Sequence, residues 1–374
     1  MAEATDHYVK KARATSTVTV AQLDQFDEII DVRSEDEFVE DHIPGAVNYP
    51  VLNNAERAEV GTIYKQVSSF DAKKIGAALV SANIARHLRE HLLQRPRDWR
   101  PLVYCWRGGG RSGALAHVLA QIGWRTGQLV GGYKVYRRTV IDDLQTLPSR
   151  FDWRVVCGMT GTGKSLLLRA LRSQSAQVLD LEALAAHRGS VLGNLPDAPQ
   201  PAQKLFESRV WHALRQFDPQ RPVFVESESK KIGNLRVPEM LIEAMWQSSC
   251  VVVEANMAVR IALLKDEYAH FLSDAPLLNT QLDCLRSLHG HAVINDWQAL
   301  ARSQAWDQLT GELLVKHYDP AYTRAINNHY PRLPQAARFA LCAHSTLAMQ
   351  QLAREVLAET PTMFAARRCG TLQQ

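Results

Sequence analysis

Two glycine-rich segments contain the residues whose types and spacing could do chemistry. The first, YCWRGGGRS (104–112), places Cys105 at the end of an apolar run and Arg111 six residues later. Its glycines allow backbone N–H groups to converge on one point, and arginines and a helix N-terminus there would stabilise a thiolate. The segment predicts a nucleophilic Cys105 in an anion-binding loop. The predicted anion ligands are Arg107, Gly108, Gly109, Gly110 and Arg111.

The second segment, GMTGTGKS (158–165), matches the phosphate-loop pattern G-x-x-x-x-G-K-[ST]. An apolar strand precedes it and a helix pattern follows, which is the context that makes the pattern specific. Lys164 is expected to reach a terminal phosphate and Ser165 to ligate magnesium. The predicted diphosphate ligands are Gly158, Gly161, Gly163, Lys164 and Ser165.

The second segment contains no nucleophile. The strand expected beside it, in VFVESES (223–229), ends in Glu226 and Glu228 rather than the usual aspartate. No base for water and no arginine finger can be assigned. The pattern therefore predicts binding of a diphosphate or triphosphate, not its hydrolysis.

Further polar residues are expected near the phosphate loop. Glu226 and Glu228 alternate along a strand end, so both would face one side and could hold magnesium or a substrate hydroxyl. The segment after the next strand could line the same pocket or be an ordinary polar loop. The candidates there are His187, Arg188 and Ser190. No tightly bound cofactor and no dedicated metal motif are predicted, and a magnesium requirement stays open.

The segment GYKVYRR (132–138) interleaves basic residues with Tyr133 and Tyr136. Such a surface can contact RNA phosphates and stack on bases. A solvated helix face is the alternative. The residues predicted to contact RNA are Lys134, Arg137 and Arg138.

The composition limits which classes of protein are possible. The 374 residues favour two domains; 46% are hydrophobic and 22% charged, as in ordinary globular proteins. The net charge of +4 allows a nucleic-acid partner without demanding one. No signal-peptide pattern and no membrane-length apolar run is found. The six cysteines form no Cys-x-x-Cys pair, which argues against zinc and a disulfide framework and favours the cytoplasm.

The elements that position the two loops alternate between strand and helix, which predicts parallel sheets in an α/β fold. Strands are expected at 28–33, 101–105, 126–132, 153–158, 176–181, 222–227 and 250–255. Helices are expected after Ser34, which forms a capping box with Glu37, and at 114–123. Residues 257–327 are almost wholly helical in pattern. A lapse of periodicity at 142–150, with Pro148, predicts domains at 1–145 and 146–374.

The first domain resembles the rhodaneses. DVRSEDEFVEDHIPGAVNYP (31–50) is similar to that family's opening signature, and Cys105 occupies its persulfide-forming position. The loop is one residue longer than in ordinary thiosulfate-handling rhodaneses, as in related cell-cycle phosphatases whose loop encloses a phosphate. The extra residue is interpreted as room for a phosphate-bearing donor.

The whole combination resembles the bacterial tRNA 2-selenouridine synthases. Besides the two loops, the resemblance is carried by HRGSVLG (187–193), VESESKKIGNLRVP (225–238) and HYDPAY (317–322). It implies an N-terminal rhodanese-like domain followed by a P-loop NTPase-like α/β domain with a helical C-terminal part.

The resemblance also implies an activity. Wobble 2-thiouridine in tRNA would become 2-selenouridine through an intermediate geranylated by geranyl diphosphate. Selenophosphate, made by a partner enzyme, would supply selenium. We expect selenophosphate in the Cys105 loop and geranyl diphosphate in the 158–165 loop.

Two other enzymes remain alternatives at this point. One is an ATP-dependent tRNA sulfurtransferase, and the other is a cysteine-based phosphatase fused to a nucleotide-binding module. A third alternative, a non-catalytic scaffold, is disfavoured by Cys105 and Arg111. The pattern does not predict which tRNAs bind, which nucleotide the loop would accept, or the oligomeric state.

Overall fold

The computed structural model describes residues 14–190, 192–195 and 198–370. The chain divides into two compact units, one formed by residues up to 143 with 202–212, the other by 144–201 with the residues from 213 onward. Residues 202–212 belong to the first unit, although they follow the predicted boundary at 145/146 in the sequence. These residues contribute Trp211, whose indole packs edge-on against Tyr136 and donates a hydrogen bond to Asp143.

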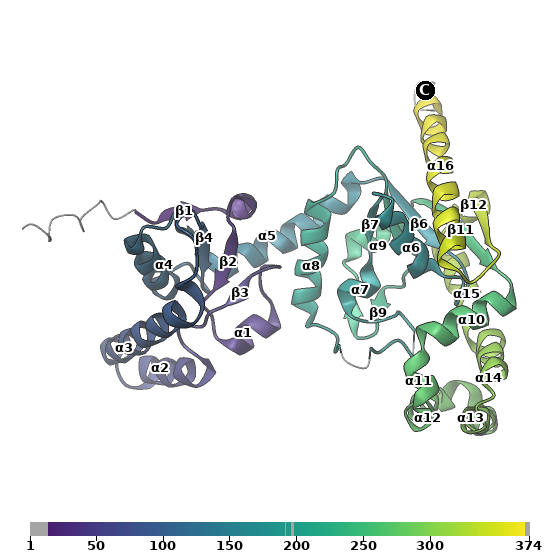
Figure 1. The fold of residues 1–374 in the computed structure, drawn as a ribbon, viewed down its shortest axis with the longest axis horizontal. Coiled ribbons are helices and arrows are strands. Elements are labelled where there is room, and N and C mark those ends of the chain that lie inside the picture. Colours follow the sequence, from purple (N-terminus) through teal and green to yellow (C-terminus); the bar gives the residue numbers. More distant parts are fainter. Residues whose placement is uncertain (1–13, 191, 196–197, 371–374) are drawn as a thin grey trace, which may run out of the picture. The chain divides into compact units, whose positions relative to one another are not determined.

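The first unit is built on a parallel five-stranded sheet of order β1-β5-β4-β2-β3 (Figure 1). Its strands are β1 (Ser16–Val18), β2 (Glu28–Asp31), β3 (Val47–Asn48), β4 (Pro101–Tyr104) and β5 (Gly127–Leu129). Its helices are α1 (Glu35–Glu40), α2 (Asn54–Gln66), α3 (Ser69–His87), α4 (Gly110–Ile122) and α5 (Gly132–Thr146), with short turns η1 (Val20–Gln25) and η2 (Leu88–Leu92).

Local sequence accounts for the elements around the first loop. All four residues of β4 are buried, and the predicted Ser34–Glu37 capping box begins α1. Helix α4 ends at Gly123 in the left-handed conformation, as its pattern predicted. Helix α5 continues through the predicted boundary segment to Thr146, and only then does the turn η3 (Leu147–Arg150) interrupt it.

The second unit contains a parallel sheet of order β12-β11-β6-β8-β7. Its strands are β6 (Trp153–Cys157), β7 (Gln177–Leu179), β8 (Val223–Glu226), β11 (Ser249–Ala255) and β12 (Ala337–Leu341). A small antiparallel pair is formed by β9 (Lys231–Ile232) and β10 (Leu235–Arg236). The predicted parallel α/β architecture is thus confirmed in both units.

Helices surround this second sheet and extend into a separate helical region (Figure 1). Those nearest the sheet are α6 (Lys164–Ser173), α7 (Leu181–Ala185), α9 (Glu239–Trp246), α10 (Met257–Glu267) and α16 (Thr346–Gly370). Helix α8 (Gln203–Arg215) spans the two units. The helical region comprises α11 (Ala269–Ser273), α12 (Ala275–Asp283), α13 (Arg286–Arg302), α14 (Trp306–Leu313), η4 (Leu314–Tyr318), α15 (Asp319–His329) and η5 (Leu333–Gln335).

Each part has its own apolar core. Ile30, Val103 and Leu115 belong to the core of the first unit. In the second unit, one core joins the sheet to α6 and α16, and another lies among α11–α14. In the part of the chain that the structure describes, no helix is long and apolar enough to cross a membrane.

Candidate active sites

The first loop connects β4 to α4. Its backbone is fixed against the start of α5, where the N–H groups of Tyr133 and Lys134 donate to the carbonyls of Cys105 and Trp106. Gly108 has φ of +66°, and a Cβ there would lie 2.5 Å from the carbonyl oxygen of Leu129. This close approach requires glycine, which explains one of the three consecutive glycines of the pattern.

The thiol of Cys105 lies at the centre of this loop and is buried. Burial alone would raise its pKa, but hydrogen bonds from the Ser112 hydroxyl and from backbone N–H groups, together with the charge of Arg111, outweigh it. The pKa of Cys105 is therefore lowered. The Ser112 Oγ donates to Sγ over 3.2 Å. The arrangement favours the thiolate form of Cys105.

The arginines near this loop have different surroundings. Arg111 is half-buried and forms an ion pair of 3.2 Å with Glu37, while Arg107 is exposed. Glu37 also pairs with Arg57. The carboxylate of Asp31 accepts hydrogen bonds from the buried Arg33 guanidinium. An anion entering the loop would compete with Glu37 for Arg111.

The second loop connects β6 to α6. Gly158 has φ of +156°, and a Cβ there would lie 2.5 Å from the carbonyl oxygen of Val253 on β11. Gly161, Gly163, Lys164 and Ser165 line one polar pocket. Because α6 begins at Lys164, the N–H groups of its first turn face this pocket. Four of the five predicted diphosphate ligands therefore lie together, whereas Gly158 lines a different cavity.

Lys164 is turned back onto its own loop. Its Nζ donates to the carbonyl of Gly158 over 2.9 Å and lies 3.4 Å from Glu226. Burial alone would lower the pKa of Lys164, but the nearby carboxylates, Glu226 first, raise it. The ammonium is therefore charged and would reach a phosphate by exchanging the carbonyl for a phosphate oxygen.

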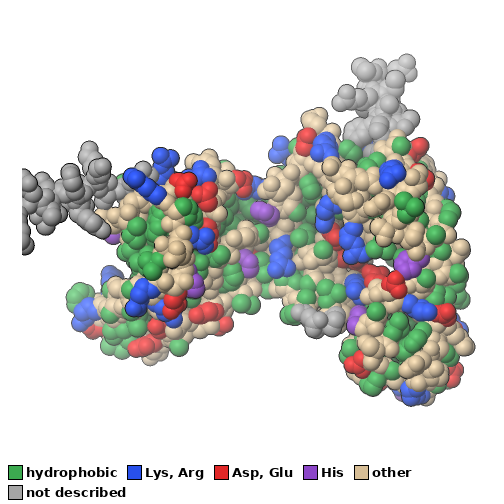
Figure 2. Space-filling view, viewed as in Figure 1, with side chains coloured by type: hydrophobic (Ala, Val, Ile, Leu, Met, Phe, Trp, Pro, Cys, Tyr) green, Lys and Arg blue, Asp and Glu red, His purple; other side chains and the backbone are tan. Residues whose placement is uncertain are grey.

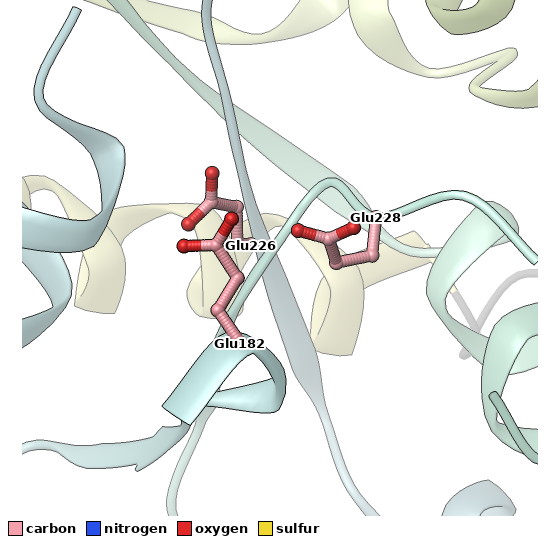
Figure 3. Close-up of side chains that lie close together, drawn as sticks. All are labelled: Glu182, Glu226 and Glu228. Carbon is pink, nitrogen blue, oxygen red and sulfur yellow. The ribbon is translucent and has the colours of Figure 1, made fainter. Parts of the chain in front are cut away.

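Three carboxylates converge on the pocket, those of Glu182, Glu226 and Glu228 (Figure 3). An oxygen of each lies within 4.8 Å of the others. Ser165 Oγ lies 3.0 Å from both Glu182 and Glu226. Glu226 and Glu228 had been predicted, but Glu182, from α7, had not.

The electrostatics of this cluster favour a cation. Burial and the charge of Glu226 raise the pKa of Glu182 to about 10 and that of Glu228 to about 8. Carboxylate and hydroxyl oxygens are the donors that Mg²⁺ prefers. The donor set therefore fits a divalent cation held by Ser165 and these carboxylates.

The segment after β7 brings one of its three predicted residues to the pocket. Arg188 lines it, 3.8 Å from Glu267, and its Nη1 has no hydrogen-bond partner among the described residues. His187 is buried and accepts from the N–H of Gly189, which orders the loop. Ser190 is hydrogen-bonded to the hydroxyl of Tyr268. Of these three residues, only Arg188 lines the pocket.

Residues of the HYDPAY segment (317–322) hold the phosphate loop in place through hydrogen bonds. The sequence alone did not indicate this role. The Tyr322 hydroxyl accepts from the N–H of Gly158 over 2.6 Å. Asp319 pairs with Arg260, which donates to the carbonyl of Thr160. The only signal in the sequence was the family likeness of that segment.

The segment 132–138 differs from its sequence interpretation. Tyr133 and Tyr136 are buried, so they cannot stack on bases, because α5 packs this face into the first unit. Arg137 is mostly buried and pairs with Glu207. Lys134 and Arg138 are exposed and available to RNA. On the visible face, basic and acidic side chains are interspersed (Figure 2).

Comparison with known proteins gives two family matches. Residues 15–139 match the rhodanese-like domain, and residues 151–283 match the tRNA 2-selenouridine synthase AAA domain. The N-terminal domain of a putative ATP/GTP binding protein from Clostridium difficile 630 is a solved structure that is 37% identical, with a TM-score of 0.30, over 33% of this chain and 98% of that one.

Two curated relatives are tRNA 2-selenouridine synthases. That of Aeromonas salmonicida is 31% identical over 82% of this chain and 89% of its own length. That of Nitrosomonas europaea is 36% identical over 64% of this chain, and the match spans 63% of the relative.

Proposed function

The chain belongs to the tRNA 2-selenouridine synthase family, and from this premise we propose that it converts wobble 2-thiouridine in tRNA to 2-selenouridine in two steps. The first step attaches a geranyl group from geranyl diphosphate to the sulfur. The second replaces the geranylated sulfur with selenium from selenophosphate. The observation that carries the proposal is the presence of two anion-binding loops, of which only one contains a thiol.

We assign the geranyl step to the loop 158–165. The thiocarbonyl sulfur attacks C1 of geranyl diphosphate, so a C–S bond forms, the C–O bond breaks, and diphosphate leaves with the electron pair; the N3 proton of the base goes to solvent. Such a reaction needs stabilisation of the leaving group rather than an activated water. Lys164, Arg188 and the N-terminus of α6 are placed to provide it.

A divalent cation held by Ser165, Glu182, Glu226 and Glu228 would neutralise part of the diphosphate charge when bound. In its absence the three carboxyl groups would neutralise none of the diphosphate charge, and any of them that ionised would repel the diphosphate. Their high pKa values show that they resist accumulating negative charge together. We therefore expect geranyl transfer to require Mg²⁺.

We assign selenium delivery to the Cys105 loop. If the thiolate attacks phosphorus of selenophosphate, an S–P bond forms, the P–Se bond breaks, and hydrogen selenide leaves with the electron pair. No oxidant or reductant is needed. The selenide then displaces geranylthiolate at C2 of the base, and water releases phosphate from the cysteine. Arg111, Ser112 and the N-terminus of α4 surround the reacting sulfur.

The test supplies the purified protein with tRNA bearing wobble 2-thiouridine. Nucleoside mass spectrometry should show geranylated 2-thiouridine with geranyl diphosphate alone, and 2-selenouridine when selenophosphate is added. Without geranyl diphosphate the 2-thiouridine should remain unmodified. Without selenophosphate the reaction should stop at geranylated 2-thiouridine. Selenation or thiolation that depends on ATP instead would support the sulfurtransferase alternative and overturn this assignment.

A further inference from the structure

A second, apolar cavity lies in the second unit, among α10, α11, α12, α14 and η4. It contains about 560 Å³ of empty space, part of it open to solvent. Its walls are mainly hydrocarbon and aromatic side chains. Phe271, Leu278, Leu309 and Leu313 are buried members of the helical core that also line the cavity.

This cavity adjoins the phosphate-loop pocket. Thr160, Leu264 and Tyr268 line both. Thr160 belongs to the loop itself, two residues after Gly158. A ligand whose diphosphate lies on Lys164 and Arg188 would therefore have its next group beside Leu264 and Tyr268, which also form part of the wall of the apolar cavity.

The chemistry of the walls distinguishes between ligands. Among the described residues, the cavity is lined by no acidic, amide or imidazole side chain. Two of its polar groups already have partners: Lys265 pairs with Asp307 at 2.6 Å, and the Tyr268 hydroxyl is hydrogen-bonded to Ser190. A ribose and a base would leave polar groups without partners there, which is costly, whereas a hydrocarbon chain would gain from burial.

We propose that this cavity binds the hydrocarbon chain of an isoprenoid diphosphate and that its walls set the accepted chain length. The inference rests on the proposed function, because it supplies the binding site for the tail of the geranyl donor. It goes further by assigning specificity to α10–α14 rather than to the phosphate loop. The observation that carries it is that the phosphate-loop pocket and a mainly apolar cavity share wall residues.

Thr310 on α14 allows the proposal to be tested with little damage to the core, because its side chain is half-buried and lines the cavity. Thr310→Trp would fill part of the space. Gln308→Trp is the matched control, because Gln308 is exposed on the same helix and does not line the cavity. Both variants leave the phosphate loop intact.

The experiment compares dimethylallyl, geranyl and farnesyl diphosphate as donors to 2-thiouridine tRNA, and inorganic diphosphate as a ligand, for the wild type and both variants. Each buried methylene changes an equilibrium about fourfold, so exclusion of two or more lowers use of the longer chain by about tenfold or more. Thr310→Trp should shift selectivity from geranyl toward dimethylallyl diphosphate by that factor. Its affinity for inorganic diphosphate should not change. Gln308→Trp should resemble the wild type in both respects.

Different failures have different meanings. If the wild type transfers a geranyl group and Thr310→Trp, folded by circular dichroism, keeps the wild-type selectivity, the cavity is not the chain site although the proposed function stands. Leu309→Ala gives a second check, because a larger cavity should improve farnesyl relative to geranyl transfer; no change there also contradicts the proposal. If the wild type transfers no isoprenoid group, both the proposed function and this inference are overturned.

Discussion

The two loops share a backbone plan and differ in what surrounds the anion site. Each follows a buried parallel strand, turns through glycines and leads into a helix N-terminus. In the first, donors and Arg111 surround a sulfur and lower its pKa. In the second, three carboxylates surround the loop, and the pKa values of Glu182 and Glu228 are raised. In the proposed function, the same arrangement of strand, glycine turn and helix N-terminus would serve a nucleophile in one unit and a cation with a leaving group in the other.

Removal of the thiol should have the largest effect. Cys105→Ala should lower selenium incorporation by ~10³-fold or more, because the nucleophile is lost. Geranyl transfer should continue, so geranylated 2-thiouridine should accumulate in the nucleoside mass spectrum. Cys284→Ala, at an exposed cysteine, is the matched control. Normal selenation by Cys105→Ala would remove the distinction between the loops.

Loss of the Lys164 ammonium should slow geranyl transfer. Lys164→Ala should lower geranyl transfer by ~10²- to 10³-fold, because the leaving diphosphate loses its charged ligand. Transfer of the geranyl group can be followed directly on 2-thiouridine tRNA without selenophosphate. Lys316→Ala, an exposed lysine of the same unit, should behave as the wild type. A Lys164→Ala variant with undiminished geranyl transfer would contradict the role given to this loop.

The fold of both loops could be predicted because strand, glycine and helix signals are local. Glu182 could not, since it reaches the site only because β7 lies beside β8 in the sheet. Tyr322 contacts Gly158 across 164 residues of sequence, which no local pattern reveals. Tyr136 was misinterpreted because alternation with basic residues does not show which helix face is buried. Arg137 was misjudged for the same reason.

The acidity of Cys105 should depend on Ser112. The lowered pKa means that reactivity toward iodoacetamide persists below the pH at which an ordinary thiol, with pKa near 8.5, loses it. Ser112→Ala removes a hydrogen bond to the sulfur, so the pH midpoint of alkylation should rise by about one unit. Ser112→Thr should restore it. The same midpoint in Ser112→Ala and the wild type would show that the hydroxyl does not stabilise the thiolate.

The smallest effect is expected at the RNA surface. Lys134→Ala/Arg138→Ala should weaken tRNA binding modestly and reduce the slope of log K against log salt by up to about two, since fewer counterions are released. Arg137 is left in place because it pairs with Glu207. Lys65→Ala/Lys73→Ala, on α2 and α3, is the control for charge alone. Equal slopes for the two double variants would assign Lys134 and Arg138 to an ordinary solvated face.

The central claim is that the loop 158–165 carries out geranyl transfer and the Cys105 loop carries out selenium delivery. It is tested most directly by using the Cys105→Ala and Lys164→Ala variants one after the other. Cys105→Ala, given geranyl diphosphate, should produce geranylated tRNA; Lys164→Ala, given that purified tRNA and selenophosphate, should convert it to 2-selenouridine. The reverse order should yield no 2-selenouridine, because Lys164→Ala cannot start the reaction and Cys105→Ala cannot finish it. If Lys164→Ala binds the pre-geranylated tRNA normally but does not selenate it, the two loops do not act on separate steps.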